Sequence, residues 1–341
     1  MLKAITIREV ALRAGVSTAT VSRTLNRSGP VSLETRAAVD RVIRESGFRP
    51  NHIGRQLKTA RTSTIGVMVP SLRNPIFADA VAGMEQVAGQ KGYNVLLASS
   101  AYQAEREASV VETFLRSRVE GMALTVADET QSPALESLMS TGLPFVLMFN
   151  PVKRSSYSTV SIDNRLAAFQ LVNGLVRLGH RRIAMVAGWF SESDRSVERQ
   201  IGYEEALDAH GLEPAAILEV GFENPDLRAR VARLQGGPRA PTAYFCSTDI
   251  LAISVIRALT GIGKRVPTDV SVAGFDGIAI GTQLTPSLST AVQPAEDMGR
   301  WAARHLMERI ERDEAVANLV LPHSIRPGES WGPPPDSTAV S

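Results

Sequence analysis

Small hydroxylated side chains gather between residues 17 and 22, and one arginine follows them at position 23. Thr18 and Ala19 are short enough to let a DNA duplex approach closely, and their methyl groups suit the methyl group of thymine. Arg23 can donate two parallel hydrogen bonds to O6 and N7 of guanine. Phosphate contacts position a protein on DNA without reading its sequence. The hydroxyl groups that we expect to make such contacts belong to Ser17, Thr20 and Ser22.

The elements that would present these side chains follow a helix-turn-helix pattern. Thr6 and Glu9 have the spacing of a capping box, which predicts a helix starting at Ile7. Gly15 permits a tight turn, and Ser17 is a suitable N-cap for a second helix. In this pattern the second helix lies in the major groove with its N-terminal side chains at the base edges. The alternative is a small three-helix unit with another role.

Further helices complete the N-terminal segment in this interpretation. Val21 and Leu25 lie four residues apart, which places both on the buried face of the second helix. A third helix is expected over residues 32–47. Pro50 then interrupts the chain, and the asparagine after it can cap a short helix over residues 51–58.

The N-terminal segment is strongly basic. Residues 1–61 contain 12 Lys and Arg residues and 4 Asp and Glu residues, a net charge of +8, whereas the remaining chain contains 25 and 31, a net charge of −6. A compact basic head on an acidic body indicates a nucleic-acid binder, and the alternative is a solvated basic face. Phe48 is the only aromatic residue of the head, which argues against stacking on single strands.

Length and composition bound the class of protein. The chain has 341 residues, which suits two or three domains, and its 44% hydrophobic and 21% charged residues are typical of a globular protein. No apolar run approaches the ~20 residues that span a bilayer, and the first residues lack the pattern of a secretory signal. Cys246 is the only cysteine, so no intrachain disulfide can form. Together these features predict a cytoplasmic protein without membrane contact.

Short apolar strands alternate with helical stretches after residue 62. Two such series predict two similar lobes, each a doubly wound parallel sheet with helices on both faces. Ligands bind beyond the carboxyl ends of strands in such sheets, so two facing lobes would form a cleft that can close on a ligand. The strands are expected over residues 64–69, 93–98, 121–126, 144–149, 182–187, 217–222, 243–247 and 270–275.

Residues at the strand ends are the candidates for this cleft. A buried arginine such as Arg199, together with carboxylates such as Asp276, can hold hydroxyl groups or an acidic group by charge-assisted hydrogen bonds. Asp249 is equally a candidate for a helix N-cap, and Trp189 for a cover of the lobe edge. The candidate ligand-binding residues are Asn74, Ile76, Phe77, Phe149, Trp189, Arg199, Thr248, Asp249 and Asp276.

Patterns for catalysis are missing from the sequence. It contains neither the phosphate-binding GxxxxGK[ST] motif nor the zinc motif HExxH, and its five histidines are scattered. Cys246 lies in an apolar strand, which is typical of a buried core thiol rather than a nucleophile. His180 is interpreted as a loop residue. We therefore expect no enzymatic activity, no cofactor and no metal site.

Five stretches of the sequence occur in the order and spacing of a known family over nearly the whole chain. The sequence resembles the lactose-repressor (LacI/GalR) family of bacterial transcription regulators. The stretches are TIREVALRAGVSTATVSRTLN, VSLETRAAVDRVIRESGFRPN, RQLKTARTSTIGVMVPSLRNPIFADAVAGME, LGHRRIA and AGFDG. The resemblance implies an N-terminal all-α helix-turn-helix head and an α/β core of two doubly wound lobes, similar to periplasmic binding proteins, between which the chain crosses three times.

The resemblance also implies domain boundaries. The expected domains are a helix-turn-helix domain over residues 1–50, a hinge helix and linker over 51–61, and a two-lobed core over 62–330. We place the crossings near residues 160, 290 and 322, so that lobe 1 comprises about 62–160 and 291–320, and lobe 2 about 161–290 and 321–330. A helix over 295–311 would return to lobe 1, and a strand over 319–325 to lobe 2. The Pro- and Ser-rich residues 331–341 are expected to be disordered.

Roles of single residues follow from the resemblance as well. It implies that Thr18, Ala19 and Arg23 read bases. Leu57 would wedge into the minor groove and kink the duplex, whereas without the resemblance it is interpreted as an apolar anchor on a linker. The other candidates for DNA contact are Thr6, Asn26, Asn51, His52 and Arg55.

The cleft shows one departure from the family. Arg199 and Asp276 match the family's ligand-binding arginine and carboxylate. Phe149 stands where many family members have an acid, so one acceptor for a ligand hydroxyl is replaced by apolar surface.

These observations predict a ligand-controlled transcription regulator, with repression as its expected effect. It would bind a palindromic operator in double-stranded DNA as a homodimer, because each head covers one half-site. A small metabolite such as a sugar, a sugar acid or a related catabolite would bind between the lobes as the effector. The alternatives are a solute-binding component of a transport system, which the basic head opposes, and a corepressor-dependent or activating regulator.

Overall fold

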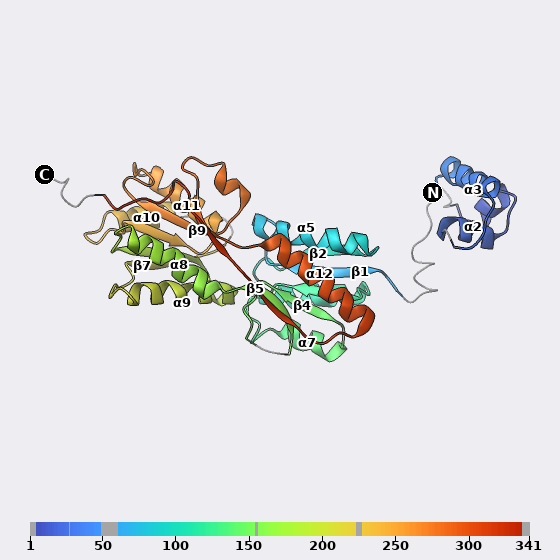
Figure 1. Cartoon of the computed structure of the whole chain (residues 1–341), viewed down its shortest axis with the longest axis horizontal. Coiled ribbons are helices and arrows are strands. Elements are labelled where there is room, and N and C mark those ends of the chain that lie inside the picture. Colours follow the sequence, from blue (N-terminus) through green and yellow to red (C-terminus); the bar gives the residue numbers. More distant parts are fainter. Residues whose placement is uncertain (1–4, 27, 49–60, 154–155, 223–226, 336–341) are drawn as a thin grey trace. The chain divides into compact units, whose positions relative to one another are not determined.

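The computed structural model describes residues 5–26, 28–48, 61–153, 156–222 and 227–335. They form two compact units that divide after residue 62. The N-terminal unit is helical, and the C-terminal unit consists of two α/β lobes (Figure 1). The predicted hinge over residues 51–61 lies outside the described residues apart from Arg61. The four candidate contacts of that hinge, which therefore also lie outside them, are Asn51, His52, Arg55 and Leu57.

Helix caps in the N-terminal unit follow the predicted pattern. Its helices are α1 (Ile7–Arg13), α2 (Thr18–Asn26) and α3 (Leu33–Ser46). Glu9 Oε2 accepts the Thr6 amide at 2.7 Å, and Thr6 Oγ1 accepts the Glu9 amide at 3.3 Å, so the capping box is present. Ser17 Oγ accepts the Thr20 amide at 3.1 Å at the start of α2. Gly47, with φ at +64°, ends α3. The predicted ends of these helices are thus confirmed.

A small apolar core holds the three helices together. Val21 is fully buried and Leu25 is half-buried, as the four-residue spacing predicted. The buried members of this core are Val10, Ala11, Val21, Val39, Val42 and Phe48. The core leaves the outer side of α2 uncovered within this unit, which is where the candidate DNA-reading residues lie.

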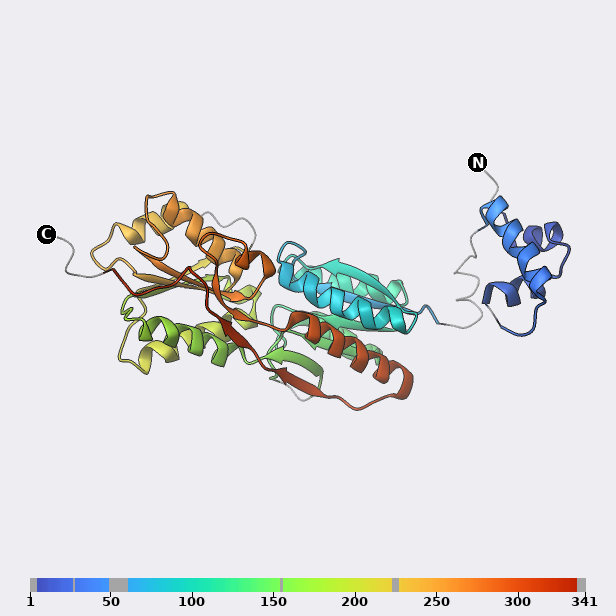
Figure 2. The same cartoon turned by 45° about the horizontal axis from the view of Figure 1, so that its top comes forward.

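Lobe 1 is a doubly wound parallel sheet. Its strands are β1 (Thr64–Val69), β2 (Asn94–Ser99), β3 (Gly121–Leu124), β4 (Phe145–Met148), β5 (Ser158–Ile162) and β11 (Asn318–Leu321). Its helices are α5 (Pro75–Gln90), α6 (Ala104–Arg116), α7 (Pro133–Thr141) and α12 (Ala295–Arg312). The strand order is β11-β5-β4-β3-β1-β2. Helices α5 and α12 cover one face of the sheet, and α6 and α7 cover the other (Figure 2). The central strands are therefore buried on both sides, which is why their sequences are apolar runs.

Lobe 2 repeats this architecture. Its strands are β6 (Ile183–Gly188), β7 (Ala216–Val220), β8 (Ala243–Cys246), β9 (Ser271–Asp276), β10 (Ser289–Val292) and β12 (Ser324–Arg326). Its helices are α8 (Asn164–Arg177), α9 (Asp194–Asp208), α10 (Arg228–Gln235) and α11 (Asp249–Thr260), with short 3-10 helices η1 (Phe190–Glu192) and η2 (Ala279–Thr282). The strand order is β12-β10-β9-β8-β6-β7, and β12 alone runs antiparallel to its neighbour. Helices α8 and α9 cover one face and α10 and α11 the other.

The chain crosses between the lobes three times, close to the expected residues 160, 290 and 322, but the last segment differs from the expected one. The expected single strand over 319–325 is two strands, because β11 pairs with β5 in lobe 1 and β12 pairs with β10 in lobe 2. Strand β5 extends lobe 1 to residue 162, and β10 keeps residues up to 292 in lobe 2. Both strands are short and rich in Ser and Thr, so the apolar pattern that marked the other strands is weak in them.

Two glycines let the helices of lobe 1 pack backbone to backbone. A Cβ atom on Gly299 of α12 would lie 1.8 Å from the carbonyl oxygen of Ala80 in α5. A Cβ atom on Gly83 of α5 would lie 2.0 Å from the carbonyl oxygen of Glu296 in α12. A side chain at either position would therefore force the two helices apart.

The first part of the expected disordered tail is ordered instead. The Gly332 amide donates to Ser271 Oγ at 3.0 Å, and the Gly332 carbonyl lies 2.9 Å from His180 Nε2. Trp331 packs on the apolar core beside Gly174 of α8. Composition alone did not reveal these contacts with lobe 2. Residues 336–341 lie outside the described part of the chain.

Candidate functional site

Helix α2 presents the candidate DNA-reading residues on its outer side. Thr18, Ala19 and Arg23 are exposed, whereas Val21 and Thr24 of the same helix are buried. Only short side chains therefore project from the start of α2, and the long cationic side chain of Arg23 follows little more than one turn later. This is the surface that a helix needs in order to enter a major groove and reach base edges.

Hydroxyl groups at the start of α2 already form hydrogen bonds within the protein. Ser17 Oγ and Thr20 Oγ1 lie 2.9 Å apart, and Ser17 is exposed while Thr20 and Ser22 are half-buried. Thr6, another predicted contact, is exposed at the N-cap of α1, where Glu9 holds its side chain. These groups are oriented before any DNA is bound. Asn26 is the last residue of α2.

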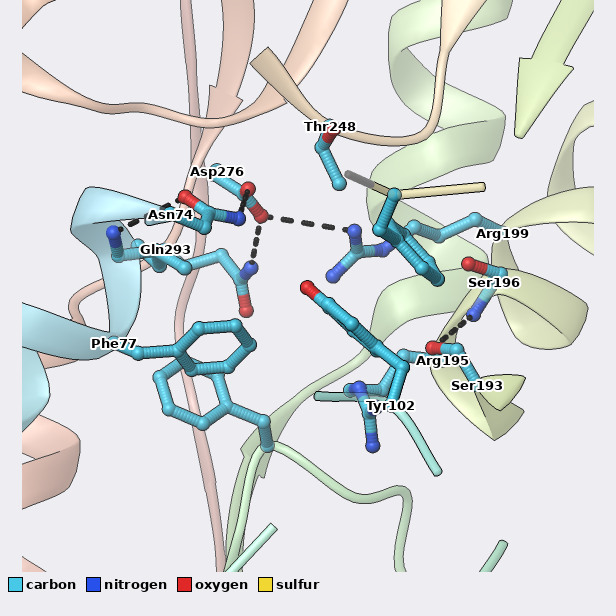
Figure 3. A pocket seen from close by; sticks show the side chains of 13 residues that line it. Asn74, Phe77, Tyr102, Ser193, Arg195, Ser196, Arg199, Thr248, Asp276 and Gln293 are labelled. Atoms are coloured by element: carbon cyan, nitrogen blue, oxygen red, sulfur yellow. Dashed lines mark hydrogen bonds and ion pairs between the residues drawn. The ribbon is translucent and has the colours of Figure 1, made fainter. Parts of the chain in front are cut away.

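A cavity lies between the lobes at the carboxyl ends of their strands (Figure 3). It holds about 320 Å³ of empty space, part of which is open to solvent. The cavity is thus a recess between the lobes with polar and aromatic side chains in its wall. The lining residues are Asn74, Ile76, Phe77, Tyr102, Phe149, Ser193, Arg195, Ser196, Arg199, Phe222, Thr248, Asp276 and Gln293.

A buried carboxylate and a buried guanidinium form the polar centre of this cavity. Asp276, at the end of β9, accepts a hydrogen bond from Asn74 Nδ2 at 3.0 Å and one from Gln293 Nε2 at 2.8 Å. Its Oδ1 lies 3.6 Å from Arg199 Nη1. Figure 3 shows Asn74 and Gln293 on one side of the carboxylate and Arg199 on the other. Because Asn74 belongs to lobe 1 and Asp276 to lobe 2, this centre joins the two lobes.

The Arg199 guanidinium is fixed by contacts on several sides. Its Nε donates to Asn164 Oδ1 at 2.8 Å and its Nη1 to the Ser247 carbonyl, while its Cζ lies 3.7 Å from the centroid of the Phe275 ring. Burial lowers the pKa of Arg199 to about 10, although Asp276 opposes that shift. The side chain is therefore still a cation at neutral pH, held in place before any ligand arrives.

Burial raises the pKa of Asp276, and Arg199, Asn74 and Gln293 oppose that shift. The backbone at Asp276 has φ at +124°, a conformation that non-glycine residues rarely adopt. Strain of this kind persists where the surroundings over-determine a residue, and it is common at binding sites. The hydrogen bonds to Asp276 provide that constraint here.

Asp249 is neither the helix N-cap nor part of the cavity wall, contrary to both roles considered for it. Thr248 is the N-cap of α11, because its side chain accepts the Leu251 amide. The Asp249 carboxylate instead accepts the amides of Gly277 and Ile278 at 2.8 Å each and a hydrogen bond from Thr290. Burial and the nearby Asp276 raise the pKa of Asp249 to about 7. Its contacts hold the backbone that follows Asp276.

Aromatic rings enclose the polar centre. The Phe77 and Phe149 rings meet edge to face in lobe 1 with centroids 5.3 Å apart. A second cavity of about 290 Å³ lies next to the first, and four residues line both cavities: Asn74, Tyr102, Phe222 and Thr248. Tyr102 and Phe222 thus contribute to a partition between the two spaces.

A buried network joins the start of α9 to lobe 1 beside the cavity. The Asp194 amide donates to the Ala127 carbonyl at 2.7 Å, and Arg195 Nη1 donates to the Val126 carbonyl at 2.7 Å. Asp194 Oδ1 lies 3.1 Å from Arg195 Nη1, and Asp194 Oδ2 accepts a hydrogen bond from Asn150 at 2.8 Å. Both residues of this pair are almost fully buried. The network therefore ties lobe 2 to lobe 1 without any ligand.

Seven of the nine candidate ligand-binding residues line the cavity. Trp189 is 43% exposed and is absent from its wall, as is Asp249. Six lining residues were not predicted: Tyr102, Ser193, Arg195, Ser196, Phe222 and Gln293. The sequence contains a signal for two of these residues. Tyr102 follows β2, and Arg195 lies one helical turn before Arg199.

Other reactive side chains are structural. Cys246 is fully buried in β8, where burial raises the pKa of its thiol. His180 is also fully buried and lies within hydrogen-bond distance of Thr242 and Ser271, so this loop residue belongs to the core of lobe 2. Over the described residues, no helix combines the length and apolarity that crossing a membrane requires.

Two family models match the chain. The model described as "Bacterial regulatory proteins, lacI family" matches residues 6–51, and the one described as "Periplasmic binding protein-like domain" matches residues 172–331. Catabolite control protein A of Priestia megaterium is 32% identical over 324 residues, which cover 94% of this chain and 97% of that protein. The transcriptional repressor CytR of Escherichia coli (strain K12) is 34% identical over 311 residues, which cover 90% of each.

Solved structures agree with these matches. A lac repressor dimer bound to operator and an anti-inducer is similar, with a TM-score of 0.84 and 26% identity, over 96% of this chain and 99% of that chain. A complex of the regulator CelR with cellobiose has a TM-score of 0.71 and 31% identity over 96% and 99% of the two chains. By its helix-turn-helix unit, its two-lobed core and its relatives over the full length, the chain belongs to the LacI family of bacterial regulatory proteins.

Proposed function

We propose that this chain is a transcriptional repressor that binds a palindromic operator as a homodimer and is controlled by a small molecule between its lobes. The observation that carries the proposal is that one chain contains two sites, one suited to DNA and one suited to a small molecule. Helix α2 presents an uncovered surface of short side chains and one arginine, and the core holds a cavity between its lobes with a buried Arg199–Asp276 centre. We place the protein in the cytoplasm, where its DNA target lies, and assign it no enzymatic activity.

On the DNA side, Thr18, Ala19 and Arg23 read base edges in the major groove. The hydroxyl groups of Ser17 and Thr20 act as an oriented pair that holds a phosphate. The remaining phosphate or groove contacts are assigned to Thr6, Ser22, Asn26, Asn51, His52, Arg55 and Leu57. The last four supply the hinge contacts that the family resemblance implies.

On the ligand side, the cavity is lined by elements of both lobes. A molecule that contacts both lobes stabilises their closed arrangement relative to an open one. Relatives support a small metabolite as the effector, since they include a protein named ribose operon repressor and a regulator solved with cellobiose. We assign ligand contact to Asn74, Ile76, Phe77, Phe149, Arg199, Thr248 and Asp276. Trp189 and Asp249 are not assigned, because they lie outside the cavity wall.

Selection from a random duplex library with the full-length protein tests this function. We expect a palindromic site with two half-sites, bound by a dimer, and an affinity that falls steeply as salt rises. A non-palindromic control duplex of equal length gives the non-specific level. Equal binding of all duplexes, or no duplex binding at all, would contradict the proposal and favour a solute-binding protein.

A further inference from the structure

The acidic group in the cavity wall is already engaged. Among the described lining residues, Asp276 is the one acid, and both of its oxygens already accept hydrogen bonds, from Asn74 and Gln293. Phe149 adds an apolar ring to the wall. The carboxylate that would most strongly accept the hydroxyl protons of a neutral polyhydroxyl ligand is therefore already engaged.

Donors in the same wall are less well used. Arg195 is 4% exposed, and its Nη1 faces the Val126 carbonyl and Asp194. Its Nη2 is enclosed and has no hydrogen-bond acceptor within the described part of the chain. A buried donor left without an acceptor is costly, so a bound acceptor at this position would stabilise the protein.

A second cation lies close by. Arg199 uses its Nε and Nη1 within the protein, and Figure 3 shows its guanidinium directed between Asp276 and Tyr102. Two arginines and one aspartate therefore belong to the lining of a single cavity. Guanidinium groups bind carboxylates by two parallel, charge-assisted hydrogen bonds.

We propose that the effector is a small carboxylic acid, and that its carboxylate accepts hydrogen bonds from Arg195. The inference rests on the proposed function, since it names the ligand class of the same cavity. A carboxylate would supply the acceptor that the enclosed Nη2 atom lacks. The aromatic rings then contact the carbon skeleton of the acid. Arg195 is thereby the residue that distinguishes an acid from its neutral counterpart.

The experiment uses ligand pairs that differ only in the acidic group. Thermal unfolding of the full-length protein is measured with glycolate against ethylene glycol and with glucuronate against glucose, at constant ionic strength set with chloride. We expect each acid to raise the melting temperature and to bind at least about tenfold more tightly than its neutral partner. Inorganic phosphate serves as the competing anion.

Variants locate the effect. Arg195→Gln removes the cation and is expected to abolish the preference for the acid, so that the acid and its neutral partner bind with similar affinity. Arg165→Gln removes an exposed arginine that pairs with Glu205 on the surface, so it is the matched control and keeps the preference. If Arg195→Gln does not fold, Arg195→Lys keeps the charge but not the paired donors, and it is expected to weaken the preference.

Each contrary outcome has its own meaning. No stabilisation by either acid, equal affinity of acid and neutral partner, or stronger stabilisation by phosphate would overturn the carboxylate assignment. An acid preference that survives in Arg195→Gln would overturn the role of Arg195. Operator binding is measured separately in the same preparations. If the DNA is bound and the acids are not, only this inference fails, whereas loss of DNA binding contradicts the proposed function itself.

Discussion

The ring of Tyr102 in lobe 1 stacks on the ring of Phe222 in lobe 2, with centroids 4.1 Å apart and planes inclined by 11°. Both rings belong to the walls of two neighbouring cavities. Ala101 and Tyr102 both have positive φ, at 51° and 60°, so the turn after β2 is constrained to a form that side chains disfavour. The stack is therefore a contact across the cleft at a point of local strain.

A double-mutant cycle measures this contact. We expect Tyr102→Ala and Phe222→Ala each to lower the free energy of unfolding of the core, with a coupling of about 0.5–1.5 kcal/mol between them, because stacked rings interact beyond their buried area. Denaturant unfolding of the two single variants and the double variant gives the coupling. Met139→Ala combined with Phe222→Ala is the control cycle, because Met139 is exposed on α7 of lobe 1. A coupling near zero for the first pair would mean that the rings merely lie side by side.

A substitution of Arg23 distinguishes base reading from phosphate contact. If Arg23 binds guanine, Arg23→Ala is expected to weaken operator binding by roughly 1–3 kcal/mol and to relax the preference at one base pair in each half-site. Affinities for operators with single-base changes, measured at one salt concentration, provide the comparison. Equal weakening on every sequence, together with a smaller salt dependence, would assign Arg23 to the phosphates instead.

Glu107 of α6 makes the stability of the core depend on pH. Burial raises the pKa of Glu107 from 4.5 to about 7, against the effects of the Ala127 amide, Arg195 and Ser132, while Asp194 adds to the rise. Between pH 4.5 and 7 the folded protein keeps a proton that the unfolded chain releases. The contribution of Glu107 is thus fully present below pH 4.5 and is lost as the pH rises through 7.

Glu107→Gln tests this dependence, because the amide resembles the protonated acid. We expect the variant to be about 1–3 kcal/mol more stable than the wild type at pH 8 and to differ little at pH 5. Glu112→Gln, on the exposed side of the same helix, is the control. Denaturant unfolding at several pH values gives the curves, and parallel curves for wild type and Glu107→Gln would refute the prediction.

Gly299 allows α12 to touch α5, and its substitution is expected to be costly. A methyl group at Gly299 would meet the Ala80 carbonyl, which belongs to the backbone and cannot move aside alone. We expect Gly299→Ala to lower the stability of the core by about 2 kcal/mol or more, despite the better helix propensity of alanine. Gly89→Ala, in α5 with open space around it, is the control and is expected to be neutral or slightly stabilising. Thermal unfolding of both variants decides between propensity and packing.

Much of the fold could be predicted because local signals agree with tertiary structure. Thr6, Glu9 and Ser17 are caps whose partners lie three residues away, so their hydrogen bonds depend on little else. Strand β1 is an unbroken apolar run. Strands β5 and β10 escaped notice because Ser and Thr interrupt their apolar pattern, although both are buried. The order of Trp331 and Gly332 depends on contacts with residues far away in the chain, which composition does not encode.

The cavity was predictable where a single rule applied. Asn74, Thr248 and Asp276 were found because side chains at the carboxyl ends of parallel strands converge. Asp249 follows Thr248 in the sequence, but its carboxylate binds the backbone after β9. A shift of one position at the start of α11 therefore places this side chain outside the cavity wall. Phe222 was hidden inside an expected strand that ends two residues earlier. The ligand-binding roles of all these residues remain predictions.

Because the chain crosses between the lobes three times, segments of the two lobes are synthesised in an interleaved order. Residues of lobe 2 from β6 to β10 leave the ribosome as one nearly continuous block. Lobe 1 emerges first but lacks α12 and β11 until residue 321 has been made. Until then the apolar face that α12 covers in the finished protein stays open. The lobe that appears first is therefore completed only after nearly all of lobe 2 has been made, and its unfinished face is a part of the chain that a chaperone would protect for long.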